Sequence, residues 1–204
     1  MKNLSRFATL SLTLAFAASL SATAQMSGQM SGQMSGQMGD QMGAPSAAHH
    51  EKPLSPPAMT SVALDGAQIS VHYSSPAMRG RAIMGGLVPY GQVWRTGANK
   101  ATSFVTSGDL KVGTLSVPAG SYTLFTLPQA PGTPWLLILS KKTGEWGIPY
   151  PDGDDLGRTP MHGAKLPKTQ QSMTISFEHT GKRSTELHVR WENTDESVLI
   201  EAVK

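Results

Sequence analysis

The sequence predicts an all-β fold, namely an antiparallel β-sandwich or flattened barrel of about eight or nine short strands. Apolar and polar residues alternate with a period of two in several segments after residue 58, which is typical of strands with one buried and one solvated face. Turn-forming residues recur at intervals of about 8–12 residues, and no segment carries a convincing amphipathic helical pattern. These observations favour antiparallel sheets over helical or α/β architectures.

Strands are predicted where the alternation is clearest. Between the first and the later alternating segments, a turn at 118–120 (PAG) is expected to join residues 110–117 and 122–127 in a hairpin. Residues 135–139 (WLLIL) are apolar on both faces, which indicates a strand in the middle of a sheet. The alternating segments are residues 68–73, 173–178, 186–192 and 197–201.

The connections between the last strands are expected to be turns. Residues 179–184 (HTGKRS) and 193–196 (NTDE) are rich in turn-forming residues and would link the last three strands into a meander. Short helices around 83–87 and 155–163 are the alternatives that the pattern leaves open, although glycine limits both.

Three parts are expected along the chain: a secretory signal peptide (1–24), a low-complexity linker (25–57) and a β-sandwich domain (58–204). Lys2 and Arg6 precede an apolar run of about 14 residues, and an A-x-A cleavage site follows. This run is shorter than the roughly 20 residues that span a bilayer, so an uncleaved anchor is the less favoured alternative. We therefore expect export to the periplasm or the medium, with no membrane-spanning segment after the signal peptide is removed.

Charge and cysteine content narrow the classes of function. The chain has 17 basic and 14 acidic residues, and two of the basic ones, Lys2 and Arg6, lie in the expected signal peptide. The remaining charges are nearly balanced, so we expect no nucleic-acid partner. The chain contains no cysteine, which excludes disulfides, thiolate catalysis and thiolate metal ligands.

A four-residue unit, QMSG and its variants, repeats five times from Gln25. Glycine in every unit disfavours a helix, so a flexible spacer is the favoured interpretation. The alternative is copper buffering, because thioethers prefer Cu(I) and two histidines follow the repeat. The residues of this alternative site are Met26, Met30, Met34, Met38, Met42, His49 and His50.

Residues 73–102 have no regular periodicity and are punctuated by glycine and proline, as in a long ordered connection that presents side chains. Guanidinium forks suit carboxylate or phosphate groups, aromatic rings stack on them or on a sugar, and asparagine both donates and accepts hydrogen bonds. The same side chains could instead satisfy carbonyl groups of the loop itself, and that structural role is the favoured alternative. The candidate ligand-binding residues are Arg79, Arg81, Tyr90, Trp94, Arg95 and Asn99.

Metal-binding patterns are weak. Residues 150–155 (YPDGDD) are rich in oxygen-bearing side chains, as calcium-binding loops are. No glutamate follows at the position that would bind the ion through both carboxylate oxygens. His162, His179 and His188 show no metal-ligand spacing, and His188 is expected on the solvated face of its strand. Apart from the copper alternative in the repeat, we therefore expect no metal.

Enzymatic motifs are also missing from the sequence. It contains no G-x-S-x-G, no P-loop and no dinucleotide-binding fingerprint. A hydrolytic carboxylate pair could be drawn from Glu145, Asp152 and Glu178, but spacing alone does not support one. We expect no cofactor, and a non-enzymatic role is favoured.

Several motifs distinguish the part of the chain after residue 54. They are YSSP (73–76), GR (80–81), PYGQVWRTGANKAT (89–102), PAGSYTLF (118–125) and WG (146–147). With these motifs, the chain resembles the DUF2911 family of exported bacterial domains of unknown function, from about residue 54 to the C-terminus. The resemblance implies a β-rich exported domain and carries over no catalytic residues.

The resulting hypothesis is an exported β-sandwich domain that binds a small polar or anionic ligand, for example a saccharide, through its Arg/Trp/Asn loop. One alternative is a hydrolase-type enzyme that uses the same cleft with an acid from another strand. The other is a structural or interaction domain with a Met-rich arm that buffers copper.

Overall fold

The computed structural model of the chain describes residues 53–203. The expected signal peptide, the Met repeat and most of the linker lie outside these residues. The described part contains ten strands and no helix, which confirms the all-β class. Residues 83–87 form turns and residues 155–160 a strand, so neither short helix that the sequence left open is present there.

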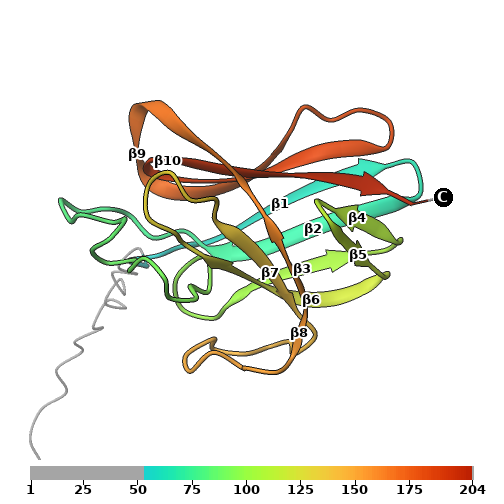
Figure 1. The fold of residues 1–204 in the computed structure, drawn as a ribbon, viewed down its shortest axis with the longest axis horizontal. Coiled ribbons are helices and arrows are strands. Elements are labelled where there is room, and N and C mark those ends of the chain that lie inside the picture. The colour runs from blue at the N-terminus through green and yellow to red at the C-terminus, as the bar shows by residue number, and fades with distance from the viewer. Residues whose placement is uncertain (1–52, 204) are drawn as a thin grey trace, which may run out of the picture. The chain divides into compact units, whose positions relative to one another are not determined.

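The strands form two antiparallel sheets that do not close into a barrel, so the fold is the sandwich. Figure 1 shows the two layers, with β9 and β10 (orange to red) in one and β1 to β3 (cyan to green) in the other. The six-stranded sheet has the order β1 (Pro57–Leu64), β2 (Ala67–Ser74), β3 (Thr102–Thr106), β6 (Gly120–Leu127), β7 (Leu136–Ser140), β8 (Asp155–Pro160). The four-stranded sheet has the order β5 (Leu115–Val117), β4 (Leu110–Val112), β10 (Ser184–Ala202), β9 (His162–Glu178).

The core lies between the sheets and is built from the predicted alternation. On β2, Ile69 and Val71 are buried while Gln68 and His72 are exposed. Each fully buried aliphatic side chain contributes about 1.5–3 kcal/mol relative to exposure. Strand β7 is paired on both sides, by β6 and β8, as the apolar segment 135–139 predicted.

The predicted hairpin between residues 110–117 and 122–127 is wrong. The first segment divides into β4 and β5, which pair with each other, while β6 joins the opposite sheet. Gly113 adopts a positive φ of 55°, which glycine tolerates and which permits a tight turn inside the apolar run. The turn at 118–120 therefore carries the chain from one sheet to the other.

The predicted turn at 193–196 is also wrong, because these residues belong to β10. Strand β10 nevertheless reverses its direction. Its ends would lie about 60 Å apart if it were straight, yet the amide of Ala202 donates to the carbonyl of Arg183 at 2.8 Å. The register with β9 shifts on both sides of Glu192, whose φ is +56°. The reversal therefore lies near Glu192 and brings residues from both halves of β10 together.

Candidate functional site

The loop between β2 and β3 holds the predicted site residues, and its arginines bond to backbone carbonyls. Arg79 donates through Nη2 to the carbonyl of Leu54. Arg81 donates to the carbonyls of Met78 (3.0 Å) and Ala77 (2.8 Å). Both guanidinium groups therefore help to fix the path of the chain, Arg81 within the loop and Arg79 through Leu54 before β1.

Trp94 and Arg95 also bind within the domain. Trp94 stacks on Trp191 with ring centroids 5.9 Å apart, and its Nε1 donates to the carbonyl of Gly97 at 3.2 Å. Arg95 lies over the ring of Trp146 at 5.1 Å and donates to that residue's carbonyl at 3.2 Å. Burial lowers the pKa of Arg95. These contacts connect the loop to strand β10 and to the segment around Trp146.

Asn99 bonds to residues outside the loop. It has a positive φ of 58°, a conformation that asparagine adopts more readily than most residues. Its Nδ2 donates to the carbonyl of Ser55 at 3.3 Å and to Ser74 Oγ at 3.2 Å. Arg79 and Asn99 thus both reach the segment of Leu54 and Ser55, while Arg81 and Arg95 bond elsewhere, so the four side chains do not converge on one ligand position.

Tyr90 differs from the other five candidates because it lines a cavity of about 600 Å³. This volume is within the usual range of small-molecule sites. Tyr90 is 37% exposed, so its ring and hydroxyl are available to a ligand. The rest of the lining comes from residues 129–135, the start of β9 and the reversal of β10, namely Met161–Lys165, Asn193, Thr194 and Glu196.

Glu196 is the unusual residue of this cavity. It is only 5% exposed, and its Oε2 has no hydrogen-bond partner. Burial, with a smaller contribution from the charge of Asp195, raises the pKa of Glu196 to about 7. Gly163, its pairing partner on β9, leaves room for the carboxyl group, because a Cβ there would lie 2.8 Å from Oε1. The cavity therefore contains a carboxyl group that can accept or release a proton near neutral pH, and one oxygen of this group has no hydrogen-bond partner.

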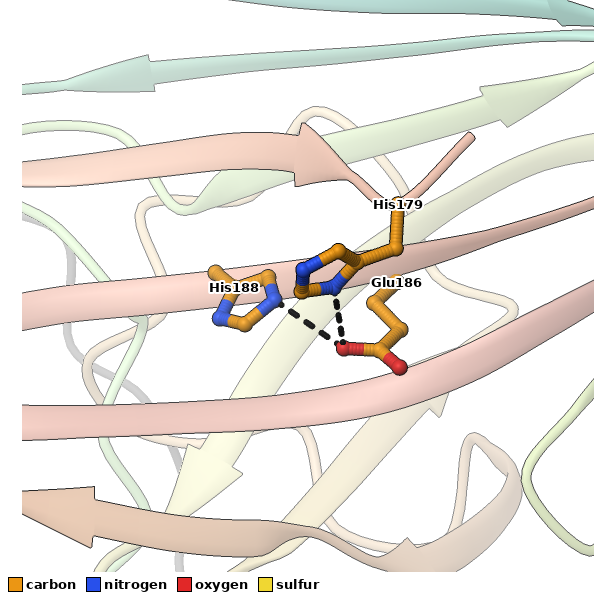
Figure 2. A group of neighbouring side chains, drawn as sticks. All are labelled: His179, Glu186 and His188. Carbon is orange, nitrogen blue, oxygen red and sulfur yellow. Dashed lines mark hydrogen bonds and ion pairs between the residues drawn. The ribbon is translucent and has the colours of Figure 1, made fainter. Parts of the chain in front are cut away.

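A second cluster lies where β9 ends and β10 begins. Figure 2 shows the rings of His179 and His188 both directed at the same carboxylate oxygen of Glu186. His179 Nδ1 lies 3.1 Å, and His188 Nε2 lies 3.3 Å, from Glu186 Oε2. Glu186 and His188 alternate with the core residues Leu187 and Val189, so the cluster is on the face of the sheet opposite the core.

An ion-pair network supports His188 from its other side. His188 Nδ1 lies 2.8 Å from Asp195 Oδ1, and Arg190 Nε lies 2.8 Å from Asp195 Oδ2. Arg190 also forms a two-pronged pair with Glu178. The hydrogen bonds from Arg190 lower the pKa of Glu178 to about 2. Asp195 reaches this network only because β10 turns back on itself.

Sequence reasoning missed both of these clusters. His188 was predicted to be solvated, but it is 6% exposed because it lies within the network of Glu186, Arg190 and Asp195. Glu196 was assigned to a turn. Neither burial could be found by spacing alone, because both depend on the reversal of β10.

The remaining carboxylates that were considered each have their own partners. Glu178 pairs with Arg190, and Glu145 lies 4.0 Å from Lys142. In the segment that resembled a calcium loop, Asp155 pairs with Arg158 at 2.8 Å. Asp152 accepts a hydrogen bond from the amide of Gly153.

The described part of the chain is therefore a β-sandwich domain with a cavity that Glu196 helps to line and a histidine–carboxylate cluster on β10. The profile of the family described as "Protein of unknown function (DUF2911)" matches residues 55–200. The chain belongs to this family, as its motifs predicted. No curated protein and no solved structure matches the chain. Within residues 53–203, no helix has the length and apolar character needed to cross a membrane.

Proposed function

We propose that this protein is an exported binding protein that holds a small polar ligand in the cavity lined by Tyr90 and Glu196. The observation that carries the proposal is the buried Glu196 carboxyl group, which has an oxygen without a hydrogen-bond partner. Buried polar atoms are almost always paired, and an unpaired one costs about 1–3 kcal/mol. A ligand hydroxyl or amine that donates to Glu196 would recover this energy.

The other residues that line the cavity indicate the chemistry of the ligand. Tyr90 offers an aromatic face and a hydroxyl, Asn193 a donor and an acceptor, and Lys165 a cation. Such a mixture suits a neutral, hydroxyl-rich molecule such as a saccharide or polyol, whereas an anion would be repelled by Glu196 above pH 7. The Arg/Trp/Asn loop then contributes Tyr90 directly, and its other candidate residues hold the loop in place.

Thermal unfolding of the full chain with a panel of neutral saccharides, polyols and sugar acids tests the proposal. A ligand at about 100 times its Kd stabilises the folded state by about 2.7 kcal/mol, which raises the Tm. Glu196→Gln should abolish the shift for the best neutral compound. Glu201→Gln, on the exposed side of the same strand, is the matched control and should leave it unchanged.

Two results would contradict this assignment. The first is that no neutral compound raises the Tm at millimolar concentration. The second is a ligand-induced rise in Tm that persists in Glu196→Gln but is lost in Arg81→Ala. That result would place the binding site in the loop between β2 and β3, as the sequence predicted.

A hydrolase-type enzyme is the second candidate, and the pKa of Glu196 is the observation that favours it. A carboxyl group with a pKa near 7 can act as a general acid or base at neutral pH. Glycoside hydrolysis usually needs two carboxylates, however, and Glu196 is the only acidic residue among the described residues that line the cavity. If the protein hydrolyses nitrophenyl glycosides and Glu196→Gln abolishes this turnover, the hydrolase hypothesis holds. If no turnover is found, the binding-protein hypothesis is retained.

A further inference from the structure

We propose that His179, Glu186 and His188 form a binding site for a divalent transition-metal ion of the Zn²⁺ class. The site lies on the face of β10 that points away from the core, and none of its three residues lines the cavity around Glu196. Figure 2 shows the three side chains. Each residue offers one ligand atom, and the three atoms lie within 4.8 Å of one another.

The first step concerns the proton on His188. Its Nδ1 lies 2.8 Å from Asp195 Oδ1, and an ionised carboxylate can only accept. Arg190 Nε donates to the other oxygen of that carboxylate, Asp195 Oδ2, at 2.8 Å, so this side of Asp195 also acts as an acceptor. Nδ1 therefore carries the proton, and Nε2 of the neutral ring presents a lone pair. The contact of 3.2 Å between Nδ1 and Arg190 Nη2 is then a close approach rather than a second hydrogen bond.

The second step concerns what this lone pair faces. His188 Nε2 is buried and has no hydrogen-bond partner, and the nearest polar group is Glu186 Oε2 at 3.3 Å. A nitrogen lone pair and a carboxylate oxygen repel each other at that distance. The arrangement is stable only when a positive charge lies between the two atoms, and this charge is supplied by a metal ion or a proton.

The geometry and the local charge both favour the metal. Zn²⁺ binds nitrogen and oxygen at about 2.0–2.1 Å, so two ligand atoms of a tetrahedral site lie about 3.3 Å apart. The separations from Glu186 Oε2 are 3.1 Å to His179 and 3.3 Å to His188. With neutral histidines, the three carboxylates of Glu178, Glu186 and Asp195 exceed the single guanidinium of Arg190 by two charges, which attracts a cation.

The hydrogen-bond partners of the three residues are also those expected around a bound metal ion. A ligating histidine usually donates its other ring nitrogen to a carboxylate, as His188 does to Asp195. Two imidazoles and one carboxylate are a ligand set that Zn²⁺ accepts, with the fourth position left for water. The side chain of His179 is 71% exposed, so that position is open to solvent.

The experiment is a calorimetric titration of the full chain with Zn²⁺. The His49→Ala/His50→Ala background removes the only pair of consecutive histidines in the sequence. One ion should bind per chain. His179→Ala should weaken this binding by at least about tenfold, the loss that changing an outer partner already causes. His179 is exposed, so its variant should fold, and His72→Ala, an exposed histidine of β2, is the matched control.

The visible absorption of bound Co²⁺ is a second measurement, and it would not change if the three residues had only a structural role. Bound in place of Zn²⁺, Co²⁺ should show the visible absorption of a four-coordinate ion, and Glu186→Gln should remove that absorption. The proposal is overturned if the background chain binds no Zn²⁺ at millimolar concentration, because a proton then separates His188 from Glu186. Equal Zn²⁺ affinity in the His179→Ala and His72→Ala variants would overturn it as well.

Discussion

Arg81 and Glu196 represent two different situations of a polar side chain in this domain. Arg81 uses its donors on the carbonyls of Met78 and Ala77, so it completes the fold. Glu196 is buried in a cavity and keeps an acceptor without a partner. A structural role consumes hydrogen-bonding capacity, whereas a binding site preserves it until the ligand arrives. This difference separates the loop arginines from Glu196 and His188.

The first prediction concerns the pH dependence of stability. The pKa of Glu196 rises from 4.5 to about 7 on folding, because burial disfavours its charge. Its contribution is therefore fully present below pH 4.5 and is lost as the pH rises through 7. Glu196→Gln should remove this loss and raise the free energy of unfolding at pH 8 by up to about 3 kcal/mol. Urea unfolding at pH 5 and pH 8 measures the difference, and an unchanged pH dependence in the variant would contradict the raised pKa.

The second prediction concerns Arg95. Its guanidinium lies over the ring of Trp146 and donates to the carbonyl of that residue. Arg95→Ala should lower the free energy of unfolding by about 1–2 kcal/mol, the sum of one hydrogen bond and one cation–π contact. Arg95→Lys keeps the charge but loses the planar fork, so it should recover only part of the loss. Full stability of Arg95→Ala in thermal unfolding would argue for a ligand-binding role instead.

The roles of individual residues could be predicted from the sequence only in part. The motif of residues 89–102 identified a loop, and Arg95 within it bonds to the carbonyl of Trp146. Asn99 bonds to Ser55 and Ser74, and this distant pairing leaves no trace in the spacing of the sequence. His188 could not be recognised, because a polar side chain between buried residues of an alternating segment normally points to solvent, and Glu196 could not be recognised, because its segment was predicted to be a turn.

At the scale of elements, the reversal of β10 organises the second half of the chain. Glu192 stands at the reversal, and its carboxylate accepts hydrogen bonds from the amides of Ile83 (3.3 Å) and Met84 (3.1 Å). The loop between β2 and β3 is thereby attached to β10. The acidic side chain at the turn thus serves the neighbouring loop as well as its own strand.

The third prediction follows from this attachment. Glu192→Ala should lower the free energy of unfolding by about 2–4 kcal/mol, because two amides lose a charged acceptor. Glu192→Gln keeps one oxygen and should show roughly half of the loss. Chemical unfolding measures both variants, and Glu201→Ala on the exposed side of β10 provides the comparison. Equal stability of the Glu192 and Glu201 variants would show that the loop is held by other contacts.

Elements were predictable where apolar residues mark the buried face. Strand β2 was recognised from Ile69 and Val71, whereas β3 was missed because its buried positions include Thr102 and Thr106. Their hydroxyls are satisfied by the carbonyls of Thr96 and Gly108 at 2.7 Å, so threonine is stable there. A pattern of hydrophobicity counts such residues as polar and does not detect the strand.

At the scale of the whole domain, the stacked pair Trp94 and Trp191 joins the two sheets. Trp191 lies on β10, while Trp94 exchanges backbone hydrogen bonds of 2.8 and 2.9 Å with Thr126 of β6. The loop between β2 and β3 therefore pairs with the six-stranded sheet at Trp94, and the ring of Trp94 contacts the other sheet. The sandwich is held together by packing, since the chain has no cysteine.

The fourth prediction tests this packing. Trp191→Ala should lower the free energy of unfolding by about 3–5 kcal/mol, as is usual when a large buried side chain is removed. Trp191→Phe keeps an aromatic ring and should lose less. The transitions followed by far-ultraviolet circular dichroism and by tryptophan fluorescence should coincide, because both sheets share one core. Separate transitions would show that the sheets unfold independently.

The sandwich class was predictable because it depends only on period-two alternation and frequent turns, which are local features. The order of the strands was not. Strands β5 and β6 are separated by two residues yet lie in different sheets, and such a crossing is decided by packing across the core. The family motifs added the position of the ordered loop, and the two clusters emerged only from the folded arrangement.

The neighbouring positions of Asp195 and Glu196 have a thermodynamic consequence. Successive residues of a strand point to opposite faces, so Asp195 supports His188 while Glu196 faces the cavity. The charge of Asp195 contributes to the raised pKa of Glu196. A cation held beside His188 would weaken that field and make Glu196 more acidic. By reciprocity, whatever favours the ionised form of Glu196 would tighten the hold on the cation, so the two faces of one strand are linked.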